Sequence, residues 1–151
     1  MNDIIVKIAT CEDTLDKIAD IVKKYREFYN VPTENINEIK TFMQERLENS
    51  ESKVFIALNE KTDEIIGFVQ LYPLFSTVSL KRQWMLNDLY VLETERKKGV
   101  GKKLMDAVVD YFKDKAKGCI LVTAKTNTVA KEFYNKLGWK TDMYDFYTFY
   151  F

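Results

Sequence analysis

The stretch that decides the fold is NDLYVLETERKKGVGKKL, residues 87–104. Leu89–Leu92 is a near-continuous apolar run, which is typical of a strand buried on both faces. A short charged loop follows, with glycines at positions 99 and 101. The apolar residues then switch to helical spacing, at Leu104, Met105, Val108, Val109 and Phe112. The stretch therefore predicts a strand, a loop and a helix, in that order.

The start of that helix has the properties of a phosphate site. The first N–H groups of a helix have no partner inside it, and the helix dipole places partial positive charge there. Gly99 and Gly101 would let the backbone approach a bulky anion, and a pyrophosphate suits such a helix start. The loop and first turn add five cations: Arg96, Lys97, Lys98, Lys102 and Lys103. On this stretch alone, an ordinary basic helix start with a glycine turn is the alternative.

The loop differs from two common phosphate-binding motifs. It lacks the Gly-Lys-Ser/Thr ending of a P-loop, which disfavours hydrolysis of nucleoside triphosphates. It also lacks the three-glycine spacing of a dinucleotide fingerprint, and it comes after mid-chain rather than at a first strand. A different phosphate-containing ligand is therefore expected.

Length and composition narrow the class of protein. The chain has 151 residues, of which 46% are hydrophobic and 14% aromatic, so we expect a single globular domain, residues 1–151. Lys and Arg number 23, as do Asp and Glu, so bulk attraction to nucleic acid is not expected. Without a membrane-spanning run or a signal-peptide pattern, the expected protein is soluble and cytoplasmic, with no membrane partner.

The histidine count is zero, which excludes Ser-His-Asp and Cys-His catalytic units. Cys11 and Cys119 are the only cysteines, so a zinc site is improbable and no metal is expected. Acid–base chemistry must then use Asp, Glu, Tyr, Lys, Cys or water.

Hydrophobic periodicity predicts an α+β domain with a mixed sheet and helices on its faces, in the order β-α-α-β-β-β-α-β-α-β. Pro73 is expected to stop or bend the third strand, and the aromatic tail Tyr144–Phe151 best fits a terminal strand. The other strands are expected near Ile4–Ala9, Val54–Leu58, Ile65–Tyr72, Trp84–Val91 and Cys119–Ala124, and the helices near residues 15–29, 36–47, 104–112 and 129–137.

A second motif is NTVAKEFYNKLGW, residues 127–139. It resembles the second motif of the GNAT superfamily of N-acetyltransferases, Asn-x-x-Ala-x-x-Phe-Tyr-x-x-x-Gly followed by an aromatic residue. The pattern Arg96-x-x-Gly99-x-Gly101 resembles the pyrophosphate-binding signature of the same family. The resemblance extends from about Val54 to Gly138 and more loosely over the whole chain. It implies a GNAT-like, largely antiparallel sheet flanked by about four helices.

The resemblance implies acetyl-CoA as co-substrate and assigns roles to both motifs. Backbone N–H groups of Lys98–Lys103 would hold the CoA pyrophosphate, while Leu89–Val91 would pair with the pantetheine arm as an added strand does. An amide of Leu89 or Tyr90 would polarise the thioester carbonyl, and Asn127 would bind pantetheine or order its loop. The full cofactor-binding set is Leu89, Tyr90, Val91, Arg96, Lys97, Lys98, Gly99, Val100, Gly101, Lys102, Lys103, Asn127, Ala130 and Tyr134.

The resemblance also implies two catalytic residues. Tyr134 would protonate the departing CoA thiolate, with simple packing of its ring as the alternative. Polyamine-acetylating relatives have Glu-Asp where this chain has Asn87-Asp88, so a carboxylate base at position 87 is excluded. We expect Asp88, or a water that it holds, to take the proton of the amine. The alternative is that Asp88 caps a β-bulge or pairs with a lysine.

The expected acceptor is a small cationic primary amine, such as a polyamine or an amino acid, because aromatic and carboxylate side chains suit a cation. Its expected contacts are Tyr29, Trp84, Asn87 and Asp88. One alternative is a protein lysine or N-terminal acetyltransferase, which predicts an open groove beside Asp88. Another is a non-catalytic acyl-CoA sensor, which would have no use for Tyr134. The aromatic tail also suggests a homodimer.

Overall fold

The structure, a computed structural model, describes residues 3–151 apart from the side chain of Asp13. It divides into two compact units, Met1–Leu121 and Val122–Phe151. No helix in the described part of the chain is both long and apolar enough to cross a membrane. The elements are β1 (Ile4–Ile8), α1 (Cys11–Phe28), α2 (Ile36–Glu48), β2 (Lys53–Asn59), β3 (Glu64–Ser76), β4 (Lys81–Val91), a 3₁₀ turn (Glu93–Glu95), α3 (Val100–Phe112), β5 (Cys119–Leu121) and α4 (Thr128–Lys136).

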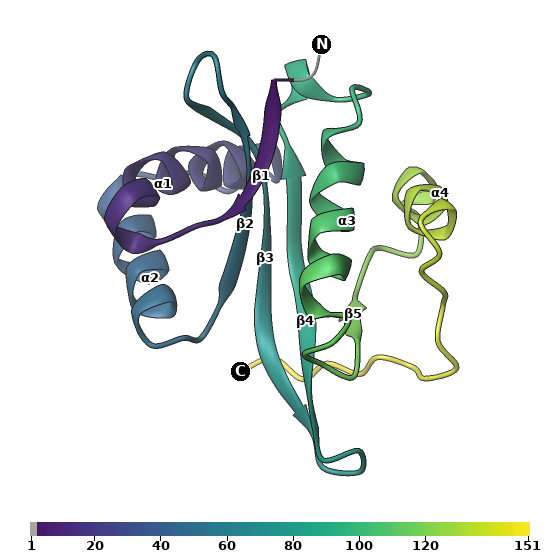
Figure 1. The fold of residues 1–151 in the computed structure, drawn as a ribbon. Coiled ribbons are helices and arrows are strands. Elements are labelled where there is room, and N and C mark those ends of the chain that lie inside the picture. Colours follow the sequence, from purple (N-terminus) through teal and green to yellow (C-terminus); the bar gives the residue numbers. More distant parts are fainter. Residues whose placement is uncertain (1–2) are drawn as a thin grey trace. The chain divides into compact units, whose positions relative to one another are not determined.

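The first unit is built on a five-stranded sheet with the strands in sequence order, β1-β2-β3-β4-β5. Strands β1 to β4 pair antiparallel, and β4 pairs parallel with β5. Helices α1 and α2 cover one face of this sheet and α3 covers the other (Figure 1). The predicted mixed, largely antiparallel sheet with four helices is therefore confirmed.

Strand β2 shows why strands of this sheet appear as apolar runs in the sequence. Val54, Ile56 and Leu58 alternate along it and belong to the core beneath α1 and α2. Phe55 points to the opposite face, where its ring lies 6.0 Å from the ring of Phe112 in α3. Because both faces are buried, the strand has no polar side to interrupt the apolar run.

The turn between α1 and α2 is fixed by local hydrogen bonds. Asn30 has the left-handed φ of 59° that often closes a helix, and the N–H of Val31 returns to the carbonyl of Arg26 at 2.9 Å. Helix α2 then begins at Asn35, whose side chain accepts a hydrogen bond from the N–H of Asn37 at 3.0 Å. These caps end one helix and start the next within a few residues, so that α2 returns alongside α1.

Gly67 allows α3 to approach the sheet closely. A Cβ at this position would lie 3.1 Å from the Tyr90 carbonyl oxygen, 3.2 Å from Leu104 Cδ1 and 3.3 Å from Val91 Cγ2. Leu104 is fully buried and the carbonyl belongs to the sheet, so neither can move easily. We expect Gly67→Ala to lower the free energy of unfolding by about 1–3 kcal/mol, measured by urea titration.

Gly118→Ala is the matched control, because a Cβ there would meet no atom within 4 Å. Its free energy of unfolding should change by no more than about 0.5 kcal/mol. Equal stability of the two variants would show that α3 does not depend on close contact at Gly67.

Pro73 was expected to stop or bend the third strand; β3 does not stop there but continues to Ser76. Pro73 pairs with Trp84, whose N–H points the other way, to the Gly118 carbonyl at 3.1 Å. This is therefore a non-hydrogen-bonded pair, in which the missing N–H of proline removes no bond to β4. On the other side β2 begins opposite Leu71, so that no β2 partner lies opposite Pro73 either.

The predicted terminal strand is wrong. Within residues 122–151 the structure contains α4 and no strand, and β5 ends at Leu121 rather than Ala124. The tail has exposed aromatic neighbours, such as Phe149, Tyr150 and Phe151, instead of an alternating pattern. An isolated extended segment has no partner for its backbone N–H and C=O groups, so aromatic content alone does not make it a strand.

Candidate active site

A β-bulge at Asn87 determines which way the middle of β4 faces. Gln70 of β3 pairs with Asp88 and Leu71 pairs with Leu86, which leaves Asn87 as the extra residue. In a regular strand, residues 84 and 88 would point to the same face. The bulge reverses this relation: Trp84 packs against Phe112 of α3 at 4.7 Å, whereas Asp88 faces α1. The structure therefore does not bring Trp84 together with Asp88.

The carboxylate of Asp88 is held on both oxygens. Its Oδ1 accepts a hydrogen bond from the Tyr25 hydroxyl at 3.0 Å, and its Oδ2 accepts one from Asn87 Nδ2 at 3.0 Å. The Tyr25 ring packs against Tyr90 and Tyr29, at 5.4 and 5.2 Å. Tyr29 is 59% exposed and lies beyond Tyr25 at the surface. Asp88 thus has a fixed orientation rather than a mobile one.

A cavity of about 420 Å³ opens beside this carboxylate, between α1, α2, β3 and β4. Its polar side chains are Arg26, Glu38, Gln70, Tyr72, Asn87 and Asp88. The remaining lining is apolar or aromatic and comes from Val22, Tyr25, Ile39, Phe42, Met43 and Phe68. The cavity therefore joins a mainly apolar wall to a few directed polar groups, as small-molecule sites do.

Gln70 gives the cavity a second hydrogen-bond acceptor. Its side chain is 4% exposed, and its Nε2 donates to the Tyr72 hydroxyl at 3.0 Å. Its Oε1 is buried and has no hydrogen-bond partner among the described residues. Burial, with the Asp88 charge as a smaller cause, raises the pKa of Tyr72 to about 12, so its hydroxyl stays protonated at neutral pH. The buried end of the cavity thus offers acceptors from Asp88 and Gln70.

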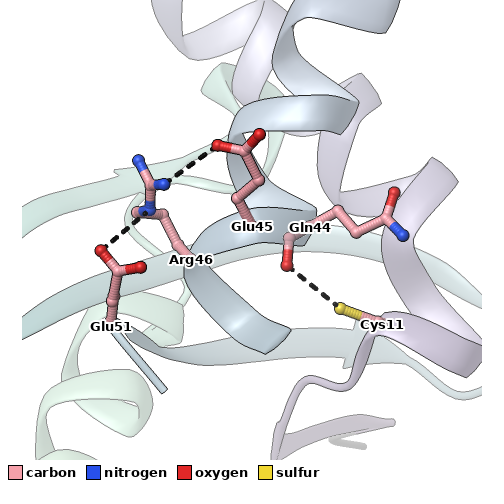
Figure 2. A network of polar contacts seen from close by, with 5 residues as sticks. All are labelled: Cys11, Gln44, Glu45, Arg46 and Glu51. Atoms are coloured by element: carbon pink, nitrogen blue, oxygen red, sulfur yellow. Dashed lines mark hydrogen bonds and ion pairs between the residues drawn. The ribbon is translucent and has the colours of Figure 1, made fainter. Parts of the chain in front are cut away.

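Figure 2 shows a network of polar contacts around the end of α2. The Arg46 guanidinium pairs with Glu51, beyond the end of α2, at 3.6 Å and lies 4.7 Å from the centre of the Phe42 ring. The Cys11 thiol donates to the Gln44 carbonyl oxygen at 3.8 Å and so joins the start of α1 to α2. The contact with Arg46 holds the ring of Phe42, which lines the cavity.

The start of α3 presents free backbone donors. Gly99 has a left-handed φ of 82°, and the first helical bond runs from the Lys103 N–H to the Gly99 carbonyl at 3.1 Å. The N–H groups of Val100, Gly101 and Lys102 consequently have no acceptor within the helix. No side chain caps the helix, and its first turn contains no acidic residue. Such a turn binds an anion well.

The cations of this loop differ in what they contact. Arg96 Nε donates to the Val91 carbonyl at 2.9 Å, and its guanidinium lies 4.8 Å from the ring centre of Phe28. Arg96 therefore ties the loop back to β4 and α1. Lys98 contacts Glu95 at 3.2 Å, Lys102 contacts Asp106 at 2.6 Å, and Lys103 donates to the Ile4 carbonyl at 3.2 Å. Lys98 and Lys102 are well exposed and can reorient.

The outer edge of β4 is open beyond the bulge. Strand β5 pairs with Trp84–Leu86 only, so no described strand pairs with the outer edge of Leu89–Val91. On the inner edge these residues pair with Gly67–Val69 of β3. An unpaired strand edge can bind an extended ligand through its backbone.

The second unit holds the other predicted residues. Asn127 caps α4 by accepting a hydrogen bond from the Ala130 N–H at 3.1 Å. Gly138, with φ of 89°, ends the helix, and the Trp139 N–H returns to the Tyr134 carbonyl at 3.0 Å. The Tyr134 ring is half-buried and lies 5.4 Å from the ring of Phe133 and 6.3 Å from that of Trp139. The helix caps thus fix the position of Tyr134 within its unit.

Comparison with known proteins identifies the family. The profile of the acetyltransferase (GNAT) family matches residues 16–139. The chain belongs to this acetyltransferase family.

It is 41% identical over 126 residues to the uncharacterized N-acetyltransferase YhfO of Bacillus subtilis (strain 168), with 83% of each chain covered. It is 32% identical over 88 residues to the D-amino-acid N-acetyltransferase HPA3 of Saccharomyces cerevisiae (strain ATCC 204508 / S288c), with 58% of this chain and 55% of that protein covered. A crystal structure of a probable acetyltransferase has a TM-score of 0.90 to it, with 34% identity and 97% of both chains covered.

The protein is therefore an acetyl-CoA-dependent N-acetyltransferase with a GNAT fold. Its residues fit the co-substrate: the first turn of α3 has unpaired amides, cations and no carboxylate, which suits a diphosphate. The backbone edge at Leu89–Val91 suits the amide-containing pantetheine arm.

Some residues of the cavity beside Asp88 were not predicted from the sequence. Gln70 is the clearest example, and one signal could have found it, because it is the only polar residue in the run Ile65–Leu71. Glu38 and Phe42 lie on α2, and their position over β4 depends on how the helices pack. Trp84, by contrast, was predicted to contact the acceptor but lies on the α3 face.

Proposed function

We propose that this N-acetyltransferase acetylates a small primary amine bound in the cavity at Asp88. The observation that carries the proposal is the pairing of two hydrogen-bond acceptors, the Asp88 carboxylate and the buried Gln70 Oε1, with a mainly apolar cavity of about 420 Å³. An amine supplies the N–H donors that these acceptors need, and its carbon chain suits the apolar wall. The volume is that of a small-molecule site rather than a long peptide groove.

The proposed chemistry is direct transfer. The amine, after losing a proton to Asp88 or to a water held by it, attacks the thioester carbonyl, and a C–N bond forms. The Leu89 amide stabilises the oxyanion. The C–S bond then breaks, and the Tyr134 hydroxyl gives its proton to the CoA thiolate. Alignment of the two substrates supplies much of the rate, so a covalent enzyme intermediate is not needed.

A thiol-release assay with acetyl-CoA tests the acceptor class. The panel would contain spermidine, phenethylamine, free amino acids of both hands, and peptides with a lysine or a free N-terminus. Turnover of a small amine is the expected result. The opposite charges of Arg26 and Glu38 in the cavity suit either a polyamine or an amino acid, and the panel separates these two. Release of the CoA thiol with the peptides only would favour a protein acetyltransferase. Binding of CoA without thiol release for any acceptor would favour a sensor.

Asp88→Asn tests the proposed base. Without the carboxylate the amine must lose its proton to solvent, so kcat at pH 7 should fall about 10²-fold. The remaining rate should then rise with pH up to the pKa of the free amine. The measurement is the pH–rate profile between pH 6 and 10.

Glu38→Gln is the matched variant, since Glu38 is the other carboxylate of the cavity. We expect it to alter KM more than the pH–rate profile. If Glu38→Gln changes the profile and Asp88→Asn does not, the base is Glu38 and Asp88 has a structural role.

A further inference from the structure

A second cavity, of about 450 Å³, shares no lining residue with the acceptor cavity. It lies where the end of β1, the loop after α2, the starts of β2 and β4 and the end of α3 meet. Lys53 is the first residue of β2 and Ser52 precedes it, while Arg82 and Trp84 come from the start of β4. Tyr111 lies at the end of α3, and Lys115 lies in the turn that follows this helix. Neither acetyl transfer nor the predicted coenzyme site uses these residues.

The charge around this cavity is entirely positive. Lys53, Arg82 and Lys115 line it, and no carboxylate does. None of these three cations forms an ion pair with a carboxylate in the described part of the chain. In a protein with equal numbers of acidic and basic residues, three unpaired cations at one cavity indicate a local site for an anion.

The cations are positioned by aromatic rings. Lys53 Nζ donates to the Tyr111 hydroxyl at 3.2 Å, and Lys115 Nζ lies 4.4 Å from the centre of the Tyr111 ring. The Arg82 guanidinium lies 4.5 Å from the ring centre of Phe75, which does not line the cavity, and 5.6 Å from that of Trp84, which does. A ring attracts a cation but does not neutralise it, so the positive charge stays available to a ligand.

The hydroxyl of Ser52 gives independent support for a ligand in this cavity. It is 7% exposed, and its hydroxyl oxygen is buried with no hydrogen-bond partner among the described residues. Buried hydroxyls nearly always have a partner. Because Ser52 lines the cavity, an anion held by the cations would supply the acceptor that this hydroxyl needs.

We propose that this second cavity binds an organic anion, a carboxylate or a phosphate ester carried on a small apolar body. Lys53, Arg82 and Lys115 attract the anionic group, and the Ser52 hydroxyl donates to it. The volume exceeds what a bare inorganic ion fills, and Ile8, Leu47 and Phe112 give the rest of the cavity an apolar lining. The inference does not depend on the acceptor of acetyl transfer.

The two tryptophans provide a direct test. In a ¹⁵N-labelled sample, the indole N–H of Trp84 reports on this cavity and that of Trp139 serves as the internal reference; Trp139→Phe assigns the signals. Benzoate and phenyl phosphate, added at constant ionic strength, should move the Trp84 signal saturably, whereas uncharged benzyl alcohol should not. Tighter binding of benzoate would identify a carboxylate ligand, and tighter binding of phenyl phosphate a phosphate ester.

Substitutions locate the site. Lys115→Gln and Ser52→Ala should each weaken the affinity for the preferred probe by about five- to tenfold, as expected for a charge-assisted hydrogen bond or a lost donor. Lys113→Gln is the matched control, because Lys113 lies two residues away and contacts Asp110 at 3.3 Å. The proposal fails if the Trp84 signal does not saturate, if benzyl alcohol moves it equally, or if Lys113→Gln weakens binding as much as Lys115→Gln.

Discussion

Replacing Tyr134 by Phe is expected to lower kcat about 10²- to 10⁴-fold, the range that general acid catalysis contributes. The variant keeps the ring that packs against Phe133 and Trp139 and loses only the hydroxyl group. The CoA thiolate would then leave without a proton donor. The affinity for acetyl-CoA should stay within about twofold, because the proposed role of the hydroxyl lies in the transition state. Thiol-release kinetics and calorimetric titration with CoA measure the two quantities.

Tyr150→Phe is the control for this substitution, since it removes a hydroxyl from an exposed tyrosine of the same unit. It should leave kcat unchanged. If Tyr134→Phe instead raises KM for acetyl-CoA and leaves kcat unchanged, the hydroxyl helps to bind the coenzyme. The acid that protonates the CoA thiolate is then another group.

The sequence was sufficient to predict the segments whose structure depends on near neighbours. Leu89–Val91 lies in the strand, and the stripe from Leu104 in the helix, that their apolar spacing indicated. Gly99 and Gly138 have left-handed φ angles of 82° and 89°, which glycine adopts without a steric penalty. Local hydrogen bonds and steric limits decide these features, and both depend on only a few consecutive residues.

Features that depend on pairing between distant residues could not be predicted. The bulge at Asn87 exists because β3 and β4 change register between Gln70 and Leu71. A shift of one residue turns the side chains that follow to the other face of the sheet. For this reason Trp84 and Asp88 separate, although a regular strand would put them on the same face. One hydrogen-bond partner of Asp88, Tyr25, likewise comes from α1, far away in sequence.

The proposed acceptor cavity illustrates the same limit. Asn87 and Asp88 had been expected to contact the acceptor and both line this cavity, whereas Tyr29 and Trp84 do not. The unpartnered Oε1 of Gln70 becomes visible only when the strand is paired and buried. Both the size of the cavity and the chemistry of its buried end are therefore tertiary properties.

The other large effect is expected at Gly99, where Gly99→Asp should bind CoA about 10- to 100-fold more weakly than Gly99→Asn. Both side chains tolerate the left-handed φ of 82°, and a Cβ there meets no atom within 4 Å, so the two variants share any backbone strain. They differ in one negative charge at the start of α3. Near a protein surface, like charges about 4 Å apart repel by up to about 4 kcal/mol, which solvent and salt reduce.

The expected effect on stability has the opposite sign to the effect on CoA affinity. It therefore distinguishes charge repulsion of CoA from misfolding of the variant. A carboxylate at a helix N-terminus stabilises the helix by about 0.3–1 kcal/mol, so Gly99→Asp should unfold at an equal or higher temperature than Gly99→Asn. The difference in CoA affinity should also shrink as ionic strength rises, because repulsion between exposed charges is screened. Calorimetric titration at low and high salt measures the CoA affinity of both variants and its dependence on ionic strength. Thermal unfolding of both variants measures their stability. Equal affinities for CoA at low salt would mean that the diphosphate does not lie on the amides of Val100–Lys102.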